Sequence, residues 1–251
     1  ALVTAWLANE TEMVEVILDG TRDIHAENAL VLADAIGYVG LCTGNADDIP
    51  FPNDPNQRSF RQAGKLTHKL HYGMGEDKFS RTYGIQRAAC KRIIAAYFSR
   101  WSRLRAWQEA TAAEAQAERQ LTTCFGRVLQ FWNFDRKGRL GDREEALAFR
   151  PQSMVGDMLK AVGPSLRREV AALGWRLCTT THDSYTPSVP AANITADVII
   201  ALKAVMQREW PEVGECKGVQ GPLWCPVDVQ VGRCWRKFKR GECEEGLRKW
   251  I

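Results

Sequence analysis

The chain has 251 residues, of which 45% are apolar and 25% charged, a composition that is typical of a packed globular protein and excludes a disordered tail. No stretch approaches the roughly 18 to 20 consecutive apolar residues that a membrane span needs, and the first residues lack the basic start of a signal peptide. We therefore expect a protein of the cytoplasm that has no membrane partner. The net charge of +4 suits a polyanionic partner but does not identify one.

Apolar and polar spacing predicts mainly helices in the first half of the chain. A helical pattern covers residues 2–18, and a short helix is expected over 26–39. Residues 40–56 are rich in Gly, Asn, Asp and Pro, which predicts a surface loop. A basic helix is expected over 58–72, ended by Gly73-Met74-Gly75, and a long uninterrupted helix over 86–119.

The second half mixes strands with helices. β-branched and aromatic residues around two glycine turns predict a strand pair within 121–140. Further elements are expected in the order helix 144–170, strands 175–181 and 185–189, helix 193–210 with Asn193 as its N-cap, and a strand over 227–231. Helices followed by strand pairs predict the α+β class.

One candidate site is a stripe of side chains on the basic helix. Steps of 4, 7 and 11 from Arg61 lead to Lys65, His68 and Tyr72, which share a helical face. The two cations could neutralise a triphosphate, and the terminal ring could stack on a base. An ordinary solvent-exposed basic helix is the alternative explanation.

A second candidate lies in the turn between the strands at 175–181 and 185–189. A carboxylate at a hairpin tip, here Asp183 after His182, is well placed to hold a divalent cation. Ordinary turn chemistry is the alternative, because Asp is common in tight turns.

Two other segments give weaker signals. Asp23 could cap a helix, and His25 could then donate to a phosphate at the helix N-terminus. Gln152, in the segment Phe149-Arg150-Pro151-Gln152-Ser153, could reach a minor-groove acceptor or cap a following helix. The eight cysteines include no CxxC pair of the kind that binds zinc, so we expect reduced thiols.

Together these segments resemble the family A DNA polymerases, the DNA polymerase I type. The motifs that carry the resemblance are Asp23-Ile24-His25, Arg61 and Lys65 followed by Tyr72-Gly73, Phe125-Gly126-Arg127, Pro151-Gln152-Ser153 and His182-Asp183. The resemblance implies a right-hand polymerase fold, in which helical fingers meet part of an antiparallel palm sheet. It assigns residues 1–24 and 142–251 to the palm and residues 25–141 to the fingers.

The resemblance also implies roles for individual residues. The expected partners are primer-template DNA and a deoxynucleoside triphosphate, and the expected cofactor is a pair of Mg²⁺ ions. The implied nucleotide-binding residues are Arg61, Lys65 (also catalytic), His68, Tyr72 and His25. The implied DNA-binding residues are Arg127, Gln152 and His182, and Asp183 is the implied metal ligand and catalytic carboxylate.

Three departures from the family pattern qualify these roles. Tyr72 follows Lys65 by seven positions where the family usually has eight, and Ser184 replaces the acidic residue that commonly follows the metal-binding Asp. The family's first metal-bridging Asp would fall about six residues before Ala1. We therefore expect this stretch alone to be inactive and to work with an upstream polymerase segment, in the same chain or as a separate subunit.

Two other functions fit the same segments. One is a noncatalytic DNA-binding module descended from a polymerase, and the other is a single-subunit RNA polymerase, which the Asp23-Ile24-His25 and His182-Asp183-Ser184 segments fit less well. The loop at 40–56 and Ser184 resemble viral members of the family, which would place the protein in the host cytoplasm.

Overall fold

The computed structural model describes residues 1–37, 59–237 and 242–250, so the loop predicted at 40–56 lies outside the described residues. Two compact units can be distinguished: unit 1 comprises residues 1–154 and 211–223, and unit 2 comprises residues 155–210 and 224–251. In the described parts of the chain, no helix is both long and apolar enough to cross a membrane.

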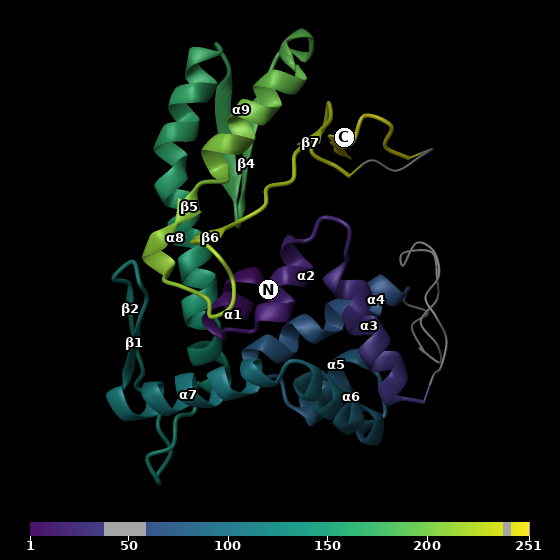
Figure 1. Ribbon diagram of the computed structural model, residues 1–251, viewed down its shortest axis with the longest axis vertical. Helices are drawn as coiled ribbons and strands as arrows, with labels where there is room; N and C mark the ends of the chain where they lie inside the picture. Colours follow the sequence, from purple (N-terminus) through teal and green to yellow (C-terminus); the bar gives the residue numbers. More distant parts are fainter. Residues whose placement is uncertain (38–58, 238–241, 251) are drawn as a thin grey trace. The chain divides into compact units, whose positions relative to one another are not determined.

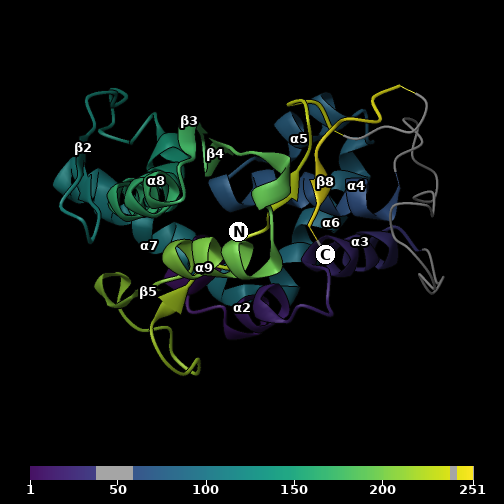
Figure 2. The same ribbon diagram turned by 90° about the horizontal axis from the view of Figure 1, so that it is seen from above.

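Helices make up most of unit 1. In chain order they are α1 (Leu2–Leu7), α2 (Thr11–Leu18), α3 (Ile24–Ala35), α4 (Phe60–Leu66), the 3-10 helix η1 (Thr67–Tyr72), α5 (Glu76–Tyr83), α6 (Arg87–Arg100) and α7 (Ser102–Glu118). Figures 1 and 2 both show α3 lying beside α4 and α6, and residue contacts join these elements. The 3-10 helix η3 (Pro211–Val213) also belongs to this unit.

Two expected helices are each broken into two. The helix predicted over 2–18 ends at Ala8, because Asn9 takes a left-handed backbone conformation (φ 52°) that asparagine tolerates better than most residues. The Asn9 side chain is used there, since its Oδ1 accepts the backbone N–H of Lys217 at 2.8 Å. The helix predicted over 86–119 breaks at Trp101, whose buried indole donates to Asn28 Oδ1 at 2.9 Å.

The sequence did not predict α5. Its apolar content is low, and Phe79 is its one buried side chain. A single anchoring ring gives no helical periodicity to detect.

Unit 1 also contains a small hairpin, as expected within 121–140. β1 (Gln120–Thr122) pairs antiparallel with β2 (Val128–Gln130), and Leu121 faces Leu129. The long helix α8 (Arg143–Ala172) follows; its residues up to Met154 belong to unit 1 and the rest to unit 2.

Unit 2 is built around a second hairpin and a small core. β3 (Arg176–Thr181) pairs antiparallel with β4 (Ser184–Ser188), as predicted. Leu166, Val170 and Trp175 form the buried cluster beneath it. The Tyr185 hydroxyl donates to the Leu159 carbonyl at 2.9 Å and fastens the hairpin to α8.

The helix predicted over 193–210 is shorter than expected. Residues Ala191–Asn193 form the 3-10 helix η2, and α9 covers Ala196–Met206. Thr195 is the N-cap in place of Asn193, because its hydroxyl lies 3.4 Å from the backbone N–H of Val198 and accepts it.

Four very short strands complete the described chain. They are β5 (Glu209–Trp210), β6 (Leu223–Trp224), β7 (Gln230–Val231) and β8 (Arg248–Lys249). Of the strand expected over 227–231, only the last two residues pair, with β8. Small antiparallel sheets among helices confirm the α+β class.

Candidate nucleotide-binding site

The basic segment predicted as one helix changes helix type along its length. Ser59 caps α4 in a capping box with Gln62, and the helix tightens into η1 at Thr67. Gly73 then ends it with a positive φ of 80°. Six residues of 3-10 helix extend about 12 Å, against about 9 Å for six residues of α-helix. The η1 segment is therefore about 3 Å longer than an α-helix of the same number of residues.

Buried polar groups hold the 3-10 segment in place. The Gln108 side chain donates to the carbonyl oxygens of Leu70 at 2.6 Å and His71 at 3.0 Å. The Thr67 hydroxyl donates to the Gly64 carbonyl at 2.7 Å and receives a bond from Asn28 at 3.2 Å. Gln108 thus supplies donors to carbonyls of the last turn, where a helix leaves carbonyl groups without an internal partner.

Gly64 allows α4 to lie directly on α3. A Cβ atom at this position would lie 1.7 Å from the carbonyl oxygen of His25 and 2.6 Å from its carbonyl carbon. Only a residue without a side chain fits so close to another backbone. The start of α3 and the middle of α4 are therefore in contact.

This contact brings Arg61 to the N-terminus of α3. Arg61 Nε lies 2.6 Å from Asp23 Oδ2, and Asp23 Oδ1 accepts the backbone N–H of His25 at 2.8 Å. Asp23 is thus the N-cap of α3, as predicted. Partial burial raises the pKa of Asp23, but the His25 N–H bond and the Arg61 charge outweigh it and hold the pKa below the ordinary value.

The charges of both cations of α4 affect the imidazole of His25. Burial lowers the pKa of its imidazole; Asp23 opposes this effect, and the charges of Lys65 and Arg61 add to it. Arg61 and Lys65 both lie on α4, the helix that packs at Gly64 against His25 at the start of α3. Lys65 itself is exposed, and its ammonium group forms no ion pair with the described residues.

His68, Tyr72 and Gln152 meet at the other end of the segment. The rings of His68 and Tyr72 pack edge to face with centroids 5.3 Å apart, and the Tyr72 hydroxyl lies 3.4 Å from His68 Nε2. Burial lowers the pKa of His68 to about 4, so the ring is neutral at neutral pH. Burial also raises the pKa of Tyr72, against a hydrogen bond from Gln152 that favours the ionised form.

The position of Gln152 corrects one interpretation of the sequence. Residues 149–153 lie inside α8, which begins at Arg143, so Gln152 cannot cap a helix. Its exposed side chain instead acts on the Tyr72 hydroxyl, where it opposes the rise in pKa that burial causes.

His71 carries the most deeply buried imidazole of the segment. Its Nε2 lies 2.6 Å from the Tyr97 hydroxyl, and complete burial holds the pKa of His71 well below its usual value. Asn28, Tyr97 and Gln108 could not be identified from the sequence as supports of this segment, because the role of a polar residue on an apolar helix face depends on a partner that only the fold reveals.

Asp183 and His182 belong to unit 2. They occupy the tip of the β3–β4 hairpin, where His182 takes a φ of 49° and the Ser184 hydroxyl donates to the Thr181 carbonyl at 2.9 Å. Both side chains are exposed, and neither has a hydrogen-bond or ion-pair partner in the described chain.

The donor set available to a metal ion is small. No group of three or more His, Cys, Asp or Glu side chains gathers among the described residues. One exposed carboxylate fits Mg²⁺ only in part, since Mg²⁺ is usually bound by one or two carboxylates together with substrate phosphates and water.

Arg127 lies at the tip of the β1–β2 hairpin, apart from the α4–η1 segment. It is exposed, and its backbone N–H donates to the Thr123 hydroxyl at 3.1 Å. The sequence-predicted residues therefore fall into three places: the α4–η1 segment with His25 and Gln152, the β1–β2 tip, and the β3–β4 tip.

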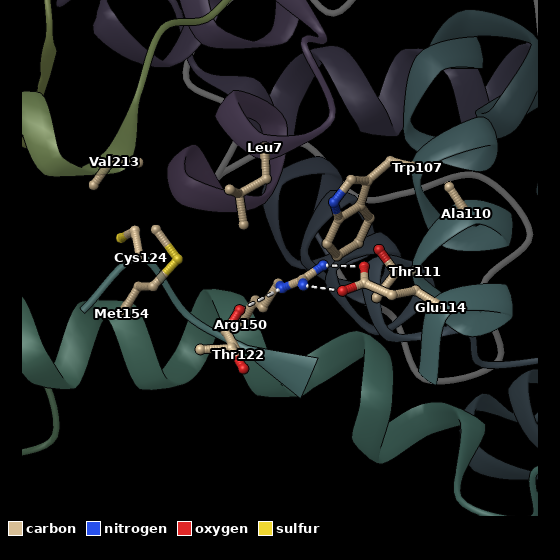
Figure 3. A pocket seen from close by; sticks show the side chains of 10 residues that line it. All are labelled: Leu7, Trp107, Ala110, Thr111, Glu114, Thr122, Cys124, Arg150, Met154 and Val213. Atoms are coloured by element: carbon tan, nitrogen blue, oxygen red, sulfur yellow. Dashed lines mark hydrogen bonds and ion pairs between the residues drawn. The ribbon is translucent and has the colours of Figure 1, made fainter. Parts of the chain in front are cut away.

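A cavity of about 320 Å³ lies elsewhere in unit 1, between α7, β1 and the start of α8 (Figure 3). Arg150 faces Glu114 across it and bonds both carboxylate oxygens, at 2.7 and 2.5 Å. Its Nε donates to the Thr122 carbonyl at 3.0 Å. Because Thr122 and Glu114 together engage all three guanidinium nitrogens of Arg150, this cavity is a poor site for a phosphate.

Comparisons with known proteins agree on one family. A family model described as DNA polymerase family A matches residues 2–237. The chain is 27% identical over 241 residues to the thermostable DNA polymerase I of Thermus filiformis, and this alignment covers 95% of the chain and 26% of that protein. It is 26% identical to the corresponding protein of Thermus thermophilus, over 94% of the chain and 26% of the relative. The chain thus spans about a quarter of the length of the curated relatives that it matches.

A solved structure shares the fold. The POL domain of Pol1 from M. smegmatis, in complex with DNA primer-template and dNTP, superimposes with a TM-score of 0.63 at 17% identity and covers 82% of this chain and 34% of that one. The match supports the right-hand polymerase fold that the resemblance implied.

Proposed function

The chain belongs to DNA polymerase family A, and from this premise we propose that it supplies the nucleotide-binding segment and one metal-binding carboxylate for template-directed DNA synthesis. The reaction is transfer of a deoxynucleotide to a primer 3′-hydroxyl. The observation that carries the proposal is the α4–η1 segment, where Arg61 and Lys65 lie on the helix that packs against His25 and where His68 and Tyr72 form a ring pair.

The cations of the segment bind the triphosphate. Lys65 is exposed and contributes a mobile point charge, whereas Arg61 is oriented by Asp23 and contributes a planar fork. His25 adds a donor at the N-terminus of α3, where the helix dipole also favours negative charge. Neutralising the phosphates lowers the barrier to phosphoryl transfer, because negative charge accumulates there in the transition state.

The ring pair at the end of the segment sets the insertion site. Tyr72 abuts the nascent base pair, and neutral His68 supports its ring from the side. Gln152 interacts with the Tyr72 hydroxyl. Its amide NH₂ group also donates to a minor-groove acceptor of the template or primer. Arg127 contacts the DNA backbone, and His182 contacts the primer terminus.

Asp183 would hold Mg²⁺ with the phosphates of the incoming nucleotide. Two such ions, when bound, would lower the pKa of the primer 3′-hydroxyl and stabilise the negative charge of the leaving pyrophosphate. A second carboxylate set comes from an upstream polymerase segment, in the same chain or a separate subunit. Residues 1–24 and 142–251 then form palm and residues 25–141 form fingers, in a cytoplasmic enzyme of viral type.

Primer extension by the intact protein that contains this chain tests the proposal. Asp183→Asn should abolish Mg²⁺-dependent extension and leave primer-template affinity nearly unchanged, because the Asp183 carboxylate has no structural partner in the described chain. Lys65→Ala should raise KM for the deoxynucleotide. Unaltered extension by Asp183→Asn would contradict the proposed metal role.

Two outcomes separate the other candidate functions. Salt-sensitive DNA binding without any extension would identify a noncatalytic DNA-binding module. A preference for ribonucleotides would identify a single-subunit RNA polymerase.

A further inference from the structure

Trp132 is the most exposed large hydrophobic side chain in the described parts of the protein. It leaves 82% of its surface in water, and it lies two positions after the end of β2. An indole presents a broad apolar face that is costly to leave hydrated, and exposed aromatic residues of this kind are frequent at binding surfaces.

The hairpin fixes the direction of this side chain. Val128 and Gln130 are exposed on β2, whereas Leu129 is partly buried between them. This alternation continues past β2, since Phe131 is 3% exposed and its N–H donates to the Arg119 carbonyl at 2.8 Å.

The buried side of the hairpin belongs to a small core with α7 and α8. Leu121, Phe131, Ala115 and Ala146 form this cluster. The opposite, solvent-facing side carries polar and aromatic side chains, which we name the Trp132 face: Gln120, Thr122, Val128, Gln130 and Trp132. Because one side is anchored, the other presents its side chains on a rigid support.

The chain around this face is strongly basic. Residues 119–140 contain five Lys or Arg residues and one acidic residue, Asp135, so this segment alone has an excess of four positive charges, as large as that of the whole chain. Asp135 is itself occupied: it accepts the backbone N–H groups of Lys137 and Arg139 and pairs with the Arg139 side chain at 2.7 Å.

Two exposed cations follow Trp132 by four and five positions in the chain. Arg136 and Lys137 form the exposed tip of the second turn, where Gly138 N–H donates to the Asp135 carbonyl at 2.9 Å, and neither forms an ion pair with the described residues. Arg136 follows Trp132 by four positions, so their Cα atoms lie no more than about 14 Å apart.

An aromatic platform with two cations that form no ion pair with the described residues, four and five positions further along the chain, matches the chemistry of single-stranded nucleic acid. Every base can stack on an indole, and every backbone phosphate can be neutralised by Lys or Arg. Duplex DNA fits less well, because its bases are already stacked on one another and their faces are not accessible.

We propose that the Trp132 face binds single-stranded DNA, with one base stacked on Trp132 and adjoining phosphates neutralised by Arg136 and Lys137. This inference rests on the proposed function and extends it, since the unpaired template ahead of the primer is the single strand that such an enzyme handles. The face would hold that strand outside the α4–η1 segment.

Binding of a fluorescent oligothymidine to the intact protein, without nucleotide or divalent metal, tests this proposal. Trp132→Ala should weaken single-strand binding between about 5-fold and about 150-fold, as expected for loss of one stacked base. Trp132→Phe should recover most of the affinity, because it restores an aromatic face. The double change Arg136→Ala and Lys137→Ala should lower the slope of log affinity against log salt by about 1.4.

Matched controls show whether a loss of single-strand affinity comes from removing the Trp132 side chain. Ile200→Ala removes another exposed apolar side chain, in unit 2, and should leave single-strand binding unchanged. Affinity for a blunt duplex should change little in Trp132→Ala. An unchanged single-strand affinity in Trp132→Ala would overturn the inference, as would an equal loss for duplex and single strand.

The same measurements separate this inference from the proposed function. If Trp132→Ala binds oligothymidine like the wild type while the protein still extends primers, the inference fails and the polymerase function stands. If the wild-type protein neither binds DNA nor extends primers, the proposed function fails and the inference fails with it.

Discussion

Replacing Gly64 by alanine tests whether the close contact between α3 and α4 organises the nucleotide-binding segment. The added Cβ would lie 1.7 Å from the His25 carbonyl oxygen, whereas ordinary contact begins near 3.4 Å. The obstructing atoms are backbone, so no side chain can rotate away, and the two helices must separate by more than an ångström.

The expected cost follows from two opposing effects. Overpacking of this kind destabilises by about 1–3 kcal/mol, and more where the backbone must move. Alanine regains up to about 1 kcal/mol of helix propensity relative to glycine. We therefore expect Gly64→Ala to lower the free energy of unfolding by about 2 kcal/mol and to weaken deoxynucleotide binding, because Arg61 and Lys65 flank this position.

Urea denaturation followed by circular dichroism measures the change in stability. Gly156→Ala is the matched control: it is the same substitution inside a helix, and a Cβ there meets nothing within 4 Å. It should be neutral or slightly stabilising. If Gly64→Ala unfolds at the same midpoint as the wild type, the reasoning about the α3–α4 contact is wrong.

Two further substitutions test the support of the segment. Gln108→Ala leaves the Leu70 and His71 carbonyls without their buried donor and should cost about 1–3 kcal/mol by denaturation; a loss below about 0.5 kcal/mol would show that water replaces the amide. For His68, the pKa of about 4 in the folded protein lies below the ordinary value of 6.5, so the unfolded state binds more protons between these pH values. Stability should therefore fall as the pH drops from about 6.5 to about 4, and His68→Gln should flatten this part of the pH–stability curve by about 1–3 kcal/mol; an unchanged curve would contradict the burial of His68.

Local chemistry in the sequence determined several features of the structure. Gly73 ends the basic segment, Asp23 caps α3, and the turn at His182-Asp183-Ser184 joins two paired strands. Each of these features depends on the conformational preference of one to three neighbouring residues, so it can be predicted from a short stretch of sequence. The family was likewise predictable, because several short motifs occur in a fixed order over most of the chain.

The tertiary structure decided where the predicted helices break. Trp101 interrupts a run of good helix formers because its buried indole bonds Asn28, a residue 73 positions earlier. Asn9 ends α1 because its side chain bonds Lys217, 208 positions later. Helix propensity is a weak local preference, and such long-range contacts readily outweigh it.

The candidate site shows the same division. From the sequence alone, residue types and spacing selected Arg61, Lys65, His68 and Tyr72. Only the fold revealed that Asp23 orients Arg61 and that the segment tightens at Thr67 into a 3-10 helix whose carbonyls are held by Gln108. The chemistry of a side chain follows from its residue type, which the sequence shows. Its partners, burial and pKa depend on residues that folding brings together from distant parts of the chain.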